Sequence, residues 1–153
     1  KDLIKKIIKI SIQNNKVIIA DPKKIDLSSY EGVNIITPNQ KEITDAANEK
    51  FLNEKNLIKF AKNIVKKYNI KNILITRSEK GMILVNDKSI NKIKANAKKI
   101  IDVTGAGDTV IATLALMLTL KLSVDESIKI SNYAAGLVIA KSGTSCIRYS
   151  DLI

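Results

Sequence analysis

Residues 102–109 read Asp-Val-Thr-Gly-Ala-Gly-Asp-Thr, between the apolar pair Ile100-Ile101 and an apolar run over 110–120. This order predicts a strand that ends at Ile101 and a buried helix over 110–120. At the start of a helix the first backbone N–H groups lack partners and the helix dipole is positive, so anions bind there favourably. Residues 105–107 have little or no side chain, which lets a phosphoryl group approach the backbone closely. The stretch therefore predicts a phosphate-binding loop in an α/β fold.

Asp108 is the unusual residue of this stretch, because a carboxylate repels bound phosphate. Its presence is explained if Asp108 takes the proton from an attacking hydroxyl while the neighbouring backbone amides stabilise the transferred phosphoryl group. Gly105, Ala106, Gly107 and Asp108 are then the catalytic residues. The alternative is that Asp108 only caps the helix and the glycines form a tight turn.

Two kinds of apolar segment alternate along the rest of the chain. Amphipathic helices are predicted over 3–15, 40–47, 54–68 and 124–141, and short buried strands over 17–20, 33–37 and 73–76. Residues 82–85 and 90–93 flank the turn 86–89 and predict a small peripheral hairpin. The alternation predicts an α/β layered fold with a mostly parallel sheet and helices on both faces. We expect one continuous domain over 1–153.

The composition excludes several kinds of site. The chain has no histidine and only one cysteine, Cys146, which excludes Cys/His zinc sites, histidine-dependent catalytic triads and an internal disulfide within these residues. A metal ion must therefore be held by oxygen atoms.

The net charge of +11 raises the possibility of nucleic-acid binding. The 26 basic residues are scattered, however, and aromatic residues make up only 4% of the chain, which favours solvated surfaces and no nucleic-acid partner. A basic surface also attracts phosphorylated substrates. The apolar stretch 110–122 is shorter than the roughly 20 residues of a membrane span, so we expect no membrane association and a cytoplasmic protein.

The stretch 102–109 resembles the carboxy-terminal signature of the ribokinase-like, or PfkB, carbohydrate kinase family at nearly all of its eight positions. Residues 39–42, Asn-Gln-Lys-Glu, resemble the Asn-x-x-Glu motif of the same family. The resemblance implies that Asn39, Gln40, Lys41 and Glu42 meet the nucleotide, and that Asn39 and Glu42 help to hold Mg²⁺, often through water. One amide and one carboxylate suit a hydrated hard cation. Taken alone, Asn39 and Glu42 would form a capping box, and the two roles can coexist.

Three further segments resemble nucleotide-handling parts of this family. Residues 76–81 are similar to its nucleotide loop, residues 132–136 to the helix that lines the adenine pocket, and residues 141–145 to the loop beside it. The implied nucleotide contacts are Thr76, Ser78, Gly81, Asn132, Ala135, Gly136 and Gly143. The implied K⁺ ligands are Asp102, Thr104, Val138, Lys141 and Gly143, the last three through backbone carbonyls. The alternatives are an ordinary turn with Gly81 at positive φ and small residues that only pack helices.

The resemblance implies an ATP- and Mg²⁺-dependent kinase that transfers a phosphoryl group to a sugar hydroxyl. Islands at 17–23, 30–32, 37–39, 76–82, 102–110 and 143–145 resemble the branch of the family that converts D-glycero-β-D-manno-heptose 7-phosphate to the 1,7-bisphosphate in ADP-heptose synthesis. The implied partner is a small sugar phosphate, and the full-length protein is expected to be a homodimer. Lys24 replaces an expected glycine, and the turn over 47–50 lacks its usual glycine, so these loops are expected to differ.

The family's amino-terminal half, which carries the sugar-binding segments and a β-strand lid, has no counterpart in residues 1–153. The His-x-Gly-His site of the adenylyltransferase that is fused to some relatives is also absent. We therefore expect the carboxy-terminal half of a kinase domain, inactive by itself. Two alternatives stay open: another family member, such as a ribokinase, fructokinase or nucleoside kinase, and a non-catalytic nucleotide-binding fragment.

Overall fold

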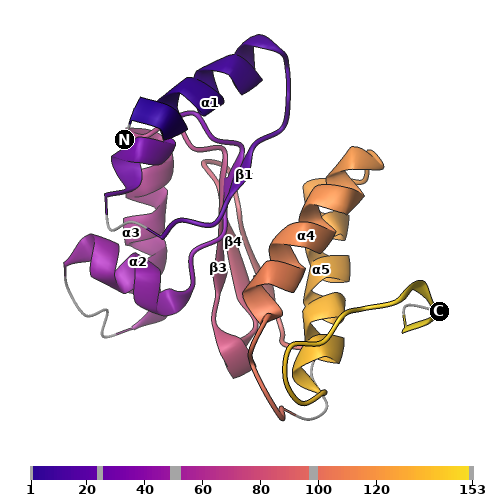
Figure 1. Ribbon diagram of the computed structural model, residues 1–153. Coiled ribbons are helices and arrows are strands. Elements are labelled where there is room, and N and C mark those ends of the chain that lie inside the picture. The colour runs from indigo at the N-terminus through magenta and orange to yellow at the C-terminus, as the bar shows by residue number, and fades with distance from the viewer. Residues whose placement is uncertain (1, 24–25, 49–52, 97–99, 152–153) are drawn as a thin grey trace. The chain divides into compact units, whose positions relative to one another are not determined.

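The computed structural model describes residues 2–23, 26–48, 53–96 and 100–151 (Figure 1). The chain groups into two compact units, of which the first comprises residues 1–77 and 83–92 and the second comprises residues 78–82 and 93–153. No helix in the described ranges is both long enough and apolar enough to cross a membrane.

The five-stranded sheet belongs almost wholly to the first unit, and its strand order is β1-β2-β3-β4-β5. The strands are β1 (Ile19–Ala20), β2 (Ile35–Ile36), β3 (Asn72–Thr76), β4 (Met82–Val85) and β5 (Ile90–Ile93). Strands β1, β2 and β3 are parallel, with Ile19 opposite Ile35 and Ile35 opposite Asn72. A four-residue turn joins β4 to β5, so the expected hairpin is confirmed and the sheet is mixed. Strand β4 is buried beside β3, and β5 forms the edge.

Three helices accompany the sheet in the first unit: α1 (Asp2–Gln13), α2 (Gln40–Ala47) and α3 (Glu54–Lys67), with a short 3₁₀ helix over Leu27–Tyr30. Helices α2 and α3 both contact β3 and lie on one face of the sheet (Figure 1). The apolar faces of these helices pack against the strands and form one buried cluster, which includes Ile36, Ile43, Leu57, Ile73 and Ile75. Burying a side chain of this size contributes about 1.5–3 kcal/mol relative to leaving it exposed.

The opposite face of the sheet is buried as well. Ile35, Leu74 and Leu84 alternate with the clustered residues along β2, β3 and β4, and each of them is at most 2% exposed. Strands that are covered on both faces are apolar at consecutive positions rather than at alternate ones. This is the physical reason why the short apolar runs in the sequence predicted these strands.

The second unit contains two helices that pack against each other, α4 (Ala106–Thr119) and α5 (Val124–Ile139). Ser123 caps α5 in a capping box, in which its Oγ accepts from the Glu126 amide and a Glu126 carboxylate oxygen accepts from the Ser123 amide. Helix α4 begins four residues before the expected position 110, directly after Gly105. The expectation of a buried α4 is only partly correct, because Val110 and Leu114 are buried while Leu116 is 56% exposed.

The expected strand at residues 100–101 is wrong. Ile100 and Ile101 belong to no strand and are 47% and 50% exposed. The amides of Ile101 and Asp102 both donate to the carbonyl oxygen of Ile139, at 2.8 and 3.2 Å. Hydrogen bonds to this one carbonyl oxygen therefore hold the segment at the end of α5, in place of pairing with a neighbouring strand. The loop over residues 102–105 follows directly.

Candidate functional site

The first cluster of polar residues follows the carboxyl ends of three neighbouring parallel strands. Asp21 comes directly after β1, Asn39 comes shortly after β2, and Arg77 comes directly after β3. The pairing continues past the strand ends, because the Thr37 amide donates to the Ala20 carbonyl at 3.0 Å and Asn39 forms an isolated bridge with Thr76. In open α/β sheets, ligands bind beyond the carboxyl ends of the strands.

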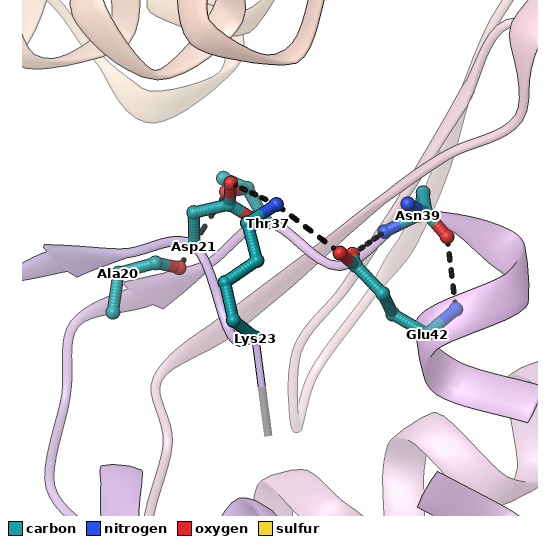
Figure 2. Close-up of polar contacts among 6 residues, drawn as sticks. All are labelled: Ala20, Asp21, Lys23, Thr37, Asn39 and Glu42. Atoms are coloured by element: carbon teal, nitrogen blue, oxygen red, sulfur yellow. Dashed lines mark hydrogen bonds and ion pairs between the residues drawn. The ribbon is translucent and has the colours of Figure 1, made fainter. Parts of the chain in front are cut away.

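Asn39 and Glu42 form a capping box at the start of α2 (Figure 2). The Asn39 Oδ1 accepts from the Glu42 amide at 2.8 Å, and the Glu42 Oε2 accepts from the Asn39 amide at 2.7 Å. The capping interpretation is therefore confirmed. It holds the Glu42 carboxylate in one place at the first turn, next to Gln40 and Lys41, whose side chains are exposed.

A lysine that the sequence analysis did not single out lies between two carboxylates in this cluster. The Lys23 Nζ is 2.7 Å from the Asp21 Oδ2 and 3.2 Å from the Glu42 Oε1 (Figure 2). The hydrogen bond to Asp21, and then the one to Glu42, raise the pKa of Lys23 against the opposing effect of partial burial. The only signal in the sequence was an Asp-Pro pair directly after a buried strand, which does not indicate its partner.

Arg77 is anchored at the end of β3 by an ionic group within the first unit. Its Nη1 and the Nζ of Lys92 each contact one oxygen of the Glu54 carboxylate at the start of α3. The hydrogen bond from Lys92, followed by the one from Arg77, holds the pKa of Glu54 below its usual value. The side chain of Arg77 is 10% exposed, so it is a structural anchor for the end of the strand.

Ser78, Glu79 and Lys80 form a short 3₁₀ turn that ends at Gly81. The Gly81 amide donates to the Ser78 carbonyl at 3.0 Å, and φ is 50° at Ser78 and 75° at Gly81. The expected turn with Gly81 at positive φ is confirmed. The amide of Thr76, at the end of β3, donates to the Pro38 carbonyl oxygen at 3.0 Å. A nucleotide contact by Thr76, Ser78 or Gly81 stays a prediction.

The second cluster is the start of α4. Its N-cap is Gly105, with φ 79° and no side-chain capping bond, so Asp108 is the third residue of the helix. The alternative that Asp108 is the N-cap is therefore wrong. The Asp108 side chain is exposed and makes no hydrogen bond or ion pair with any residue that the structure describes.

The backbone at the start of α4 is open. A Cβ atom at Gly107 would meet nothing within 4 Å. The amides of Gly107 and Asp108 donate to no acceptor within residues 2–23, 26–48, 53–96 and 100–151, as expected for the first turn of a helix. The Thr109 amide and hydroxyl both donate to the Gly105 carbonyl, at 2.9 and 2.8 Å, which fixes the turn. Two amides and one carboxylate without a partner among these described residues thus lie within one turn.

Asp102 connects this turn to the loop after α5. Its Oδ1 accepts from the Thr104 amide at 2.9 Å, and its Oδ2 accepts from the Gly143 amide at 3.1 Å. The hydrogen bonds from Thr104, and then the one from Gly143, hold the pKa of Asp102 below its usual value. Asp102, Thr104 and Gly143, which the resemblance assigned to a K⁺ site, are therefore brought together in the structure.

The remaining expected residues of the second unit are mostly engaged in packing. Asn132 is 8% exposed, and its Nδ2 donates to the Lys94 carbonyl at 2.8 Å. Ala135 and Gly136 are buried on α5. The Lys141 amide donates to the Val138 carbonyl at 3.0 Å, and the Lys141 Nζ is 3.3 Å from Asp151. These positions fit the alternative of helix packing, and their contact with a nucleotide stays a prediction.

The oxygen donors of the first cluster fit a hydrated divalent cation better than a bare one. The structure contains, in its described part, no group of three or more His, Cys, Asp or Glu residues that could hold a metal ion directly. Asp21 and Glu42 are two carboxylates, and Asn39 adds an amide. Mg²⁺ commonly keeps several waters and binds through one or two carboxylates together with substrate phosphates.

Comparison with known proteins identifies the family of the chain. The model of the pfkB family of carbohydrate kinases matches residues 1–148. The chain is 40% identical to the bifunctional protein HldE of Granulibacter bethesdensis, over 98% of this chain and 32% of that protein. It is 39% identical to the bifunctional protein HldE of Campylobacter fetus, with the same coverage of 98% and 32%. The chain thus spans about a third of the length of these curated relatives.

Solved structures agree with this fold. The chain superposes on phosphofructokinase-2 of Escherichia coli in complex with potassium with a TM-score of 0.86 and 20% identity, covering 97% of this chain and 49% of that one. It superposes on Arabidopsis thaliana ribokinase complexed with ribose and ATP with a TM-score of 0.82 and 20% identity, covering 93% and 47%. The fold is therefore the ribokinase-like α/β fold, as the sequence predicted. With its family model matched over nearly its whole length, the chain belongs to the pfkB family of carbohydrate kinases.

Proposed function

We propose that residues 1–153 are the carboxy-terminal, nucleotide-handling half of an ATP-dependent sugar kinase. The observation that carries this proposal is the start of α4, where the exposed Asp108 carboxylate and the amides of Gly107 and Asp108 have no hydrogen-bond partner in the described part of the chain. A helix start with free amides binds anions, and a carboxylate at such a place is unfavourable for phosphate binding alone. A carboxylate that accepts a proton during the transfer accounts for both features.

The reaction follows from this arrangement. Asp108 accepts the proton of the sugar hydroxyl as the hydroxyl oxygen forms a bond to the γ-phosphorus of ATP and the bond to the bridging oxygen of ADP breaks. The amides of Gly107 and Asp108 stabilise the negative charge on the transferred group. Asp102 keeps this turn in place through its hydrogen bonds with Thr104 and Gly143.

Asn39, Glu42 and Asp21 would hold the magnesium ion that accompanies the nucleotide. When bound, Mg²⁺ neutralises charge on the phosphates. The capping box keeps the Glu42 carboxylate oriented. The carboxylate oxygens still have lone pairs that can accept hydrogen bonds from water molecules bound to the ion. Gln40 and Lys41, both exposed on the same turn, are proposed to face the nucleotide.

A potassium ion is proposed near the loop of α4. The carbonyl oxygens of Lys141 and Gly143 accept no backbone hydrogen bond in the part of the chain that the structure describes, and Asp102 joins their loop to Thr104. These oxygens suit a monovalent cation, and the potassium complex of E. coli phosphofructokinase-2 supports the proposal. Val138 is the weakest member, since its carbonyl already accepts the Lys141 amide.

The acceptor that we propose is D-glycero-β-D-manno-heptose 7-phosphate, phosphorylated to the 1,7-bisphosphate for lipopolysaccharide core biosynthesis. Support comes from the identity of about 40% to the HldE proteins and from the sequence islands that resemble this branch. The structural neighbours do not bear on the choice of sugar, because they are only about 20% identical to this chain. A cytoplasmic homodimer remains our expectation for the full-length protein.

A panel of acceptors tests this assignment. We expect the full-length protein to show its highest kcat/KM with the heptose 7-phosphate, well above ribose, fructose, fructose 6-phosphate and adenosine. The rate of ADP formation at saturating Mg-ATP is the measurement. A preference for ribose or fructose would establish the second candidate, another kinase of the same family, because the visible motifs handle ATP rather than the sugar. ATP binding without transfer to any acceptor would indicate a non-catalytic fragment.

Glu42→Gln tests the magnesium site. The amide still accepts the hydrogen bond of the capping box through its oxygen, so the thermal midpoint should change little. The loss of one negative charge should raise the Mg²⁺ concentration for half-maximal activity and lower turnover. A Mg²⁺ titration of the kinase rate at fixed ATP measures both effects. Unchanged magnesium dependence would leave Glu42 with the capping role alone.

A further inference from the structure

A cation of the chain itself lies between the carboxylate that follows β1, Asp21, and the carboxylate in the first turn of α2, Glu42. The Lys23 Nζ contacts the Asp21 Oδ2 at 2.7 Å and the Glu42 Oε1 at 3.2 Å (Figure 2). Since both oxygens contact the same nitrogen, they are no more than about 6 Å apart. The two carboxylates therefore converge on one point, and the ammonium group fills it.

A hydrated Mg²⁺ ion would need the same space. Its waters lie about 2.0–2.1 Å from the ion, and a hydrogen bond of about 2.7–2.8 Å from water to a carboxylate oxygen extends its reach to roughly 4–5 Å. One hydrated ion can thus contact both Asp21 and Glu42, but not while the ammonium group of Lys23 lies between them. Binding of the ion and binding of Lys23 at this point exclude each other.

The ion pairs of Lys23 can break at little cost, whereas the hydrogen bond between Glu42 and the Asn39 amide belongs to the capping box and remains. The Lys23 side chain is 70% exposed, and ion pairs made by exposed lysines contribute little to stability. The other Glu42 oxygen accepts the Asn39 amide at 2.7 Å inside the capping box, so this carboxylate stays in position when Lys23 leaves. Asp21 is only 24% exposed, directly after β1.

We propose that Lys23 is an internal cation that holds the place of the divalent metal between Asp21 and Glu42 and is displaced when the metal binds. Lys23 is then a positioning residue: it keeps two carboxylates from repelling each other before the metal arrives, and it lowers the affinity for metal alone. The inference rests on the proposed function only in placing the metal at Glu42. It requires no assumption about the sugar.

Binding of Mn²⁺ alone, measured on the 153-residue chain by the EPR signal of the free ion, tests the proposal. Removal of one positive charge a few ångströms from a divalent ion should tighten Mn²⁺ binding by about three- to tenfold in Lys23→Gln, allowing for screening by solvent and salt. Lys23→Arg should bind no more tightly than the parent, because its planar guanidinium pairs with carboxylates at least as well. Glu42→Gln should weaken binding.

Lys6→Gln is the matched control, since it removes the same charge from an exposed position on α1. Its affinity for Mn²⁺ should equal that of the parent, and circular dichroism melts should show all variants folded. Three results would each overturn the proposal. The first is that Lys23→Gln binds Mn²⁺ no more tightly than the parent, and the second is that Lys6→Gln tightens binding to the same extent. The third is that neither the parent nor Lys23→Gln binds Mn²⁺. Absence of turnover by the full-length protein with every acceptor, together with tightened Mn²⁺ binding in Lys23→Gln, would refute the proposed function but not this role of Lys23.

Discussion

Asp108→Asn in the full-length protein should lower kcat by about 10²–10⁴-fold, which is the usual contribution of general-base assistance. Asparagine has the same size but cannot accept the proton of the sugar hydroxyl. The change also removes a negative charge next to the bound phosphates, so the apparent affinity for ATP should hold or improve. Single-turnover rates with saturating sugar and Mg-ATP measure the effect on the transfer step.

The stability of this variant separates catalysis from folding. Asp108 is not the N-cap, which is Gly105, and with no partner among the residues that the structure describes its carboxylate interacts chiefly with the dipole at the start of α4. Removing this charge should therefore lower the unfolding free energy by at most about 1 kcal/mol. Asp125→Asn, in the first turn of α5, is the matched control and should leave kcat unchanged. Turnover of Asp108→Asn within about threefold of the parent would exclude the mechanism proposed for α4.

Gly81→Ala should have the largest effect on stability. An alanine Cβ at this position would lie 2.0 Å from the carbonyl oxygen of Ile93 and 2.6 Å from the amide nitrogen of Ala95. Both atoms belong to the backbone, so no side-chain rotation relieves the overlap. Gly81 also has φ 75°, which is unfavourable for alanine. Together these effects should lower the unfolding free energy by more than about 3 kcal/mol.

Gly107→Ala provides the comparison for this prediction. It introduces the same methyl group in the first turn of α4, where a Cβ meets nothing within 4 Å. Alanine is a better helix former than glycine, so stability should be unchanged or higher by up to about 1 kcal/mol. Chemical denaturation of both full-length variants measures the difference. If Gly81→Ala unfolded at the same denaturant concentration as Gly107→Ala, the close approach of residues 93–95 to Gly81 would be wrong.

The elements that could be predicted from the sequence are those whose signals are local. Helix α2 has the predicted bounds because Asn39 and Glu42 cap its start three residues apart and Asn48, with φ 53°, ends it. The hairpin of β4 and β5 also has its predicted bounds, since Asn86 accepts the amides of Lys88 and Ser89 within the turn. In both cases the deciding hydrogen bonds join residues that are two or three positions apart.

The glycine-rich stretch shows where local reasoning fails. Ile100 and Ile101 have the apolar side chains of a strand, but among the residues that the structure describes their segment donates backbone hydrogen bonds to the carbonyl of Ile139 at the end of α5 and not to a strand. A strand needs a partner strand, and no property of residues 100–101 indicates whether one lies beside them. In the same way, Asp108 is a plausible cap by composition, yet the positive φ of Gly105 starts the helix three residues earlier.

The sequence by itself determined the α/β class, the strands of the sheet and the chemical types of the candidate residues, because periodicity and side-chain chemistry are properties of short segments. The tertiary structure decided how residues far apart in the sequence meet. Lys23 reaches Glu42 across 19 positions and Asp102 reaches Gly143 across 41, because parallel strands and packed helices bring their ends together. Such pairs depend on how whole elements pack, and one sequence carries no local signal for them.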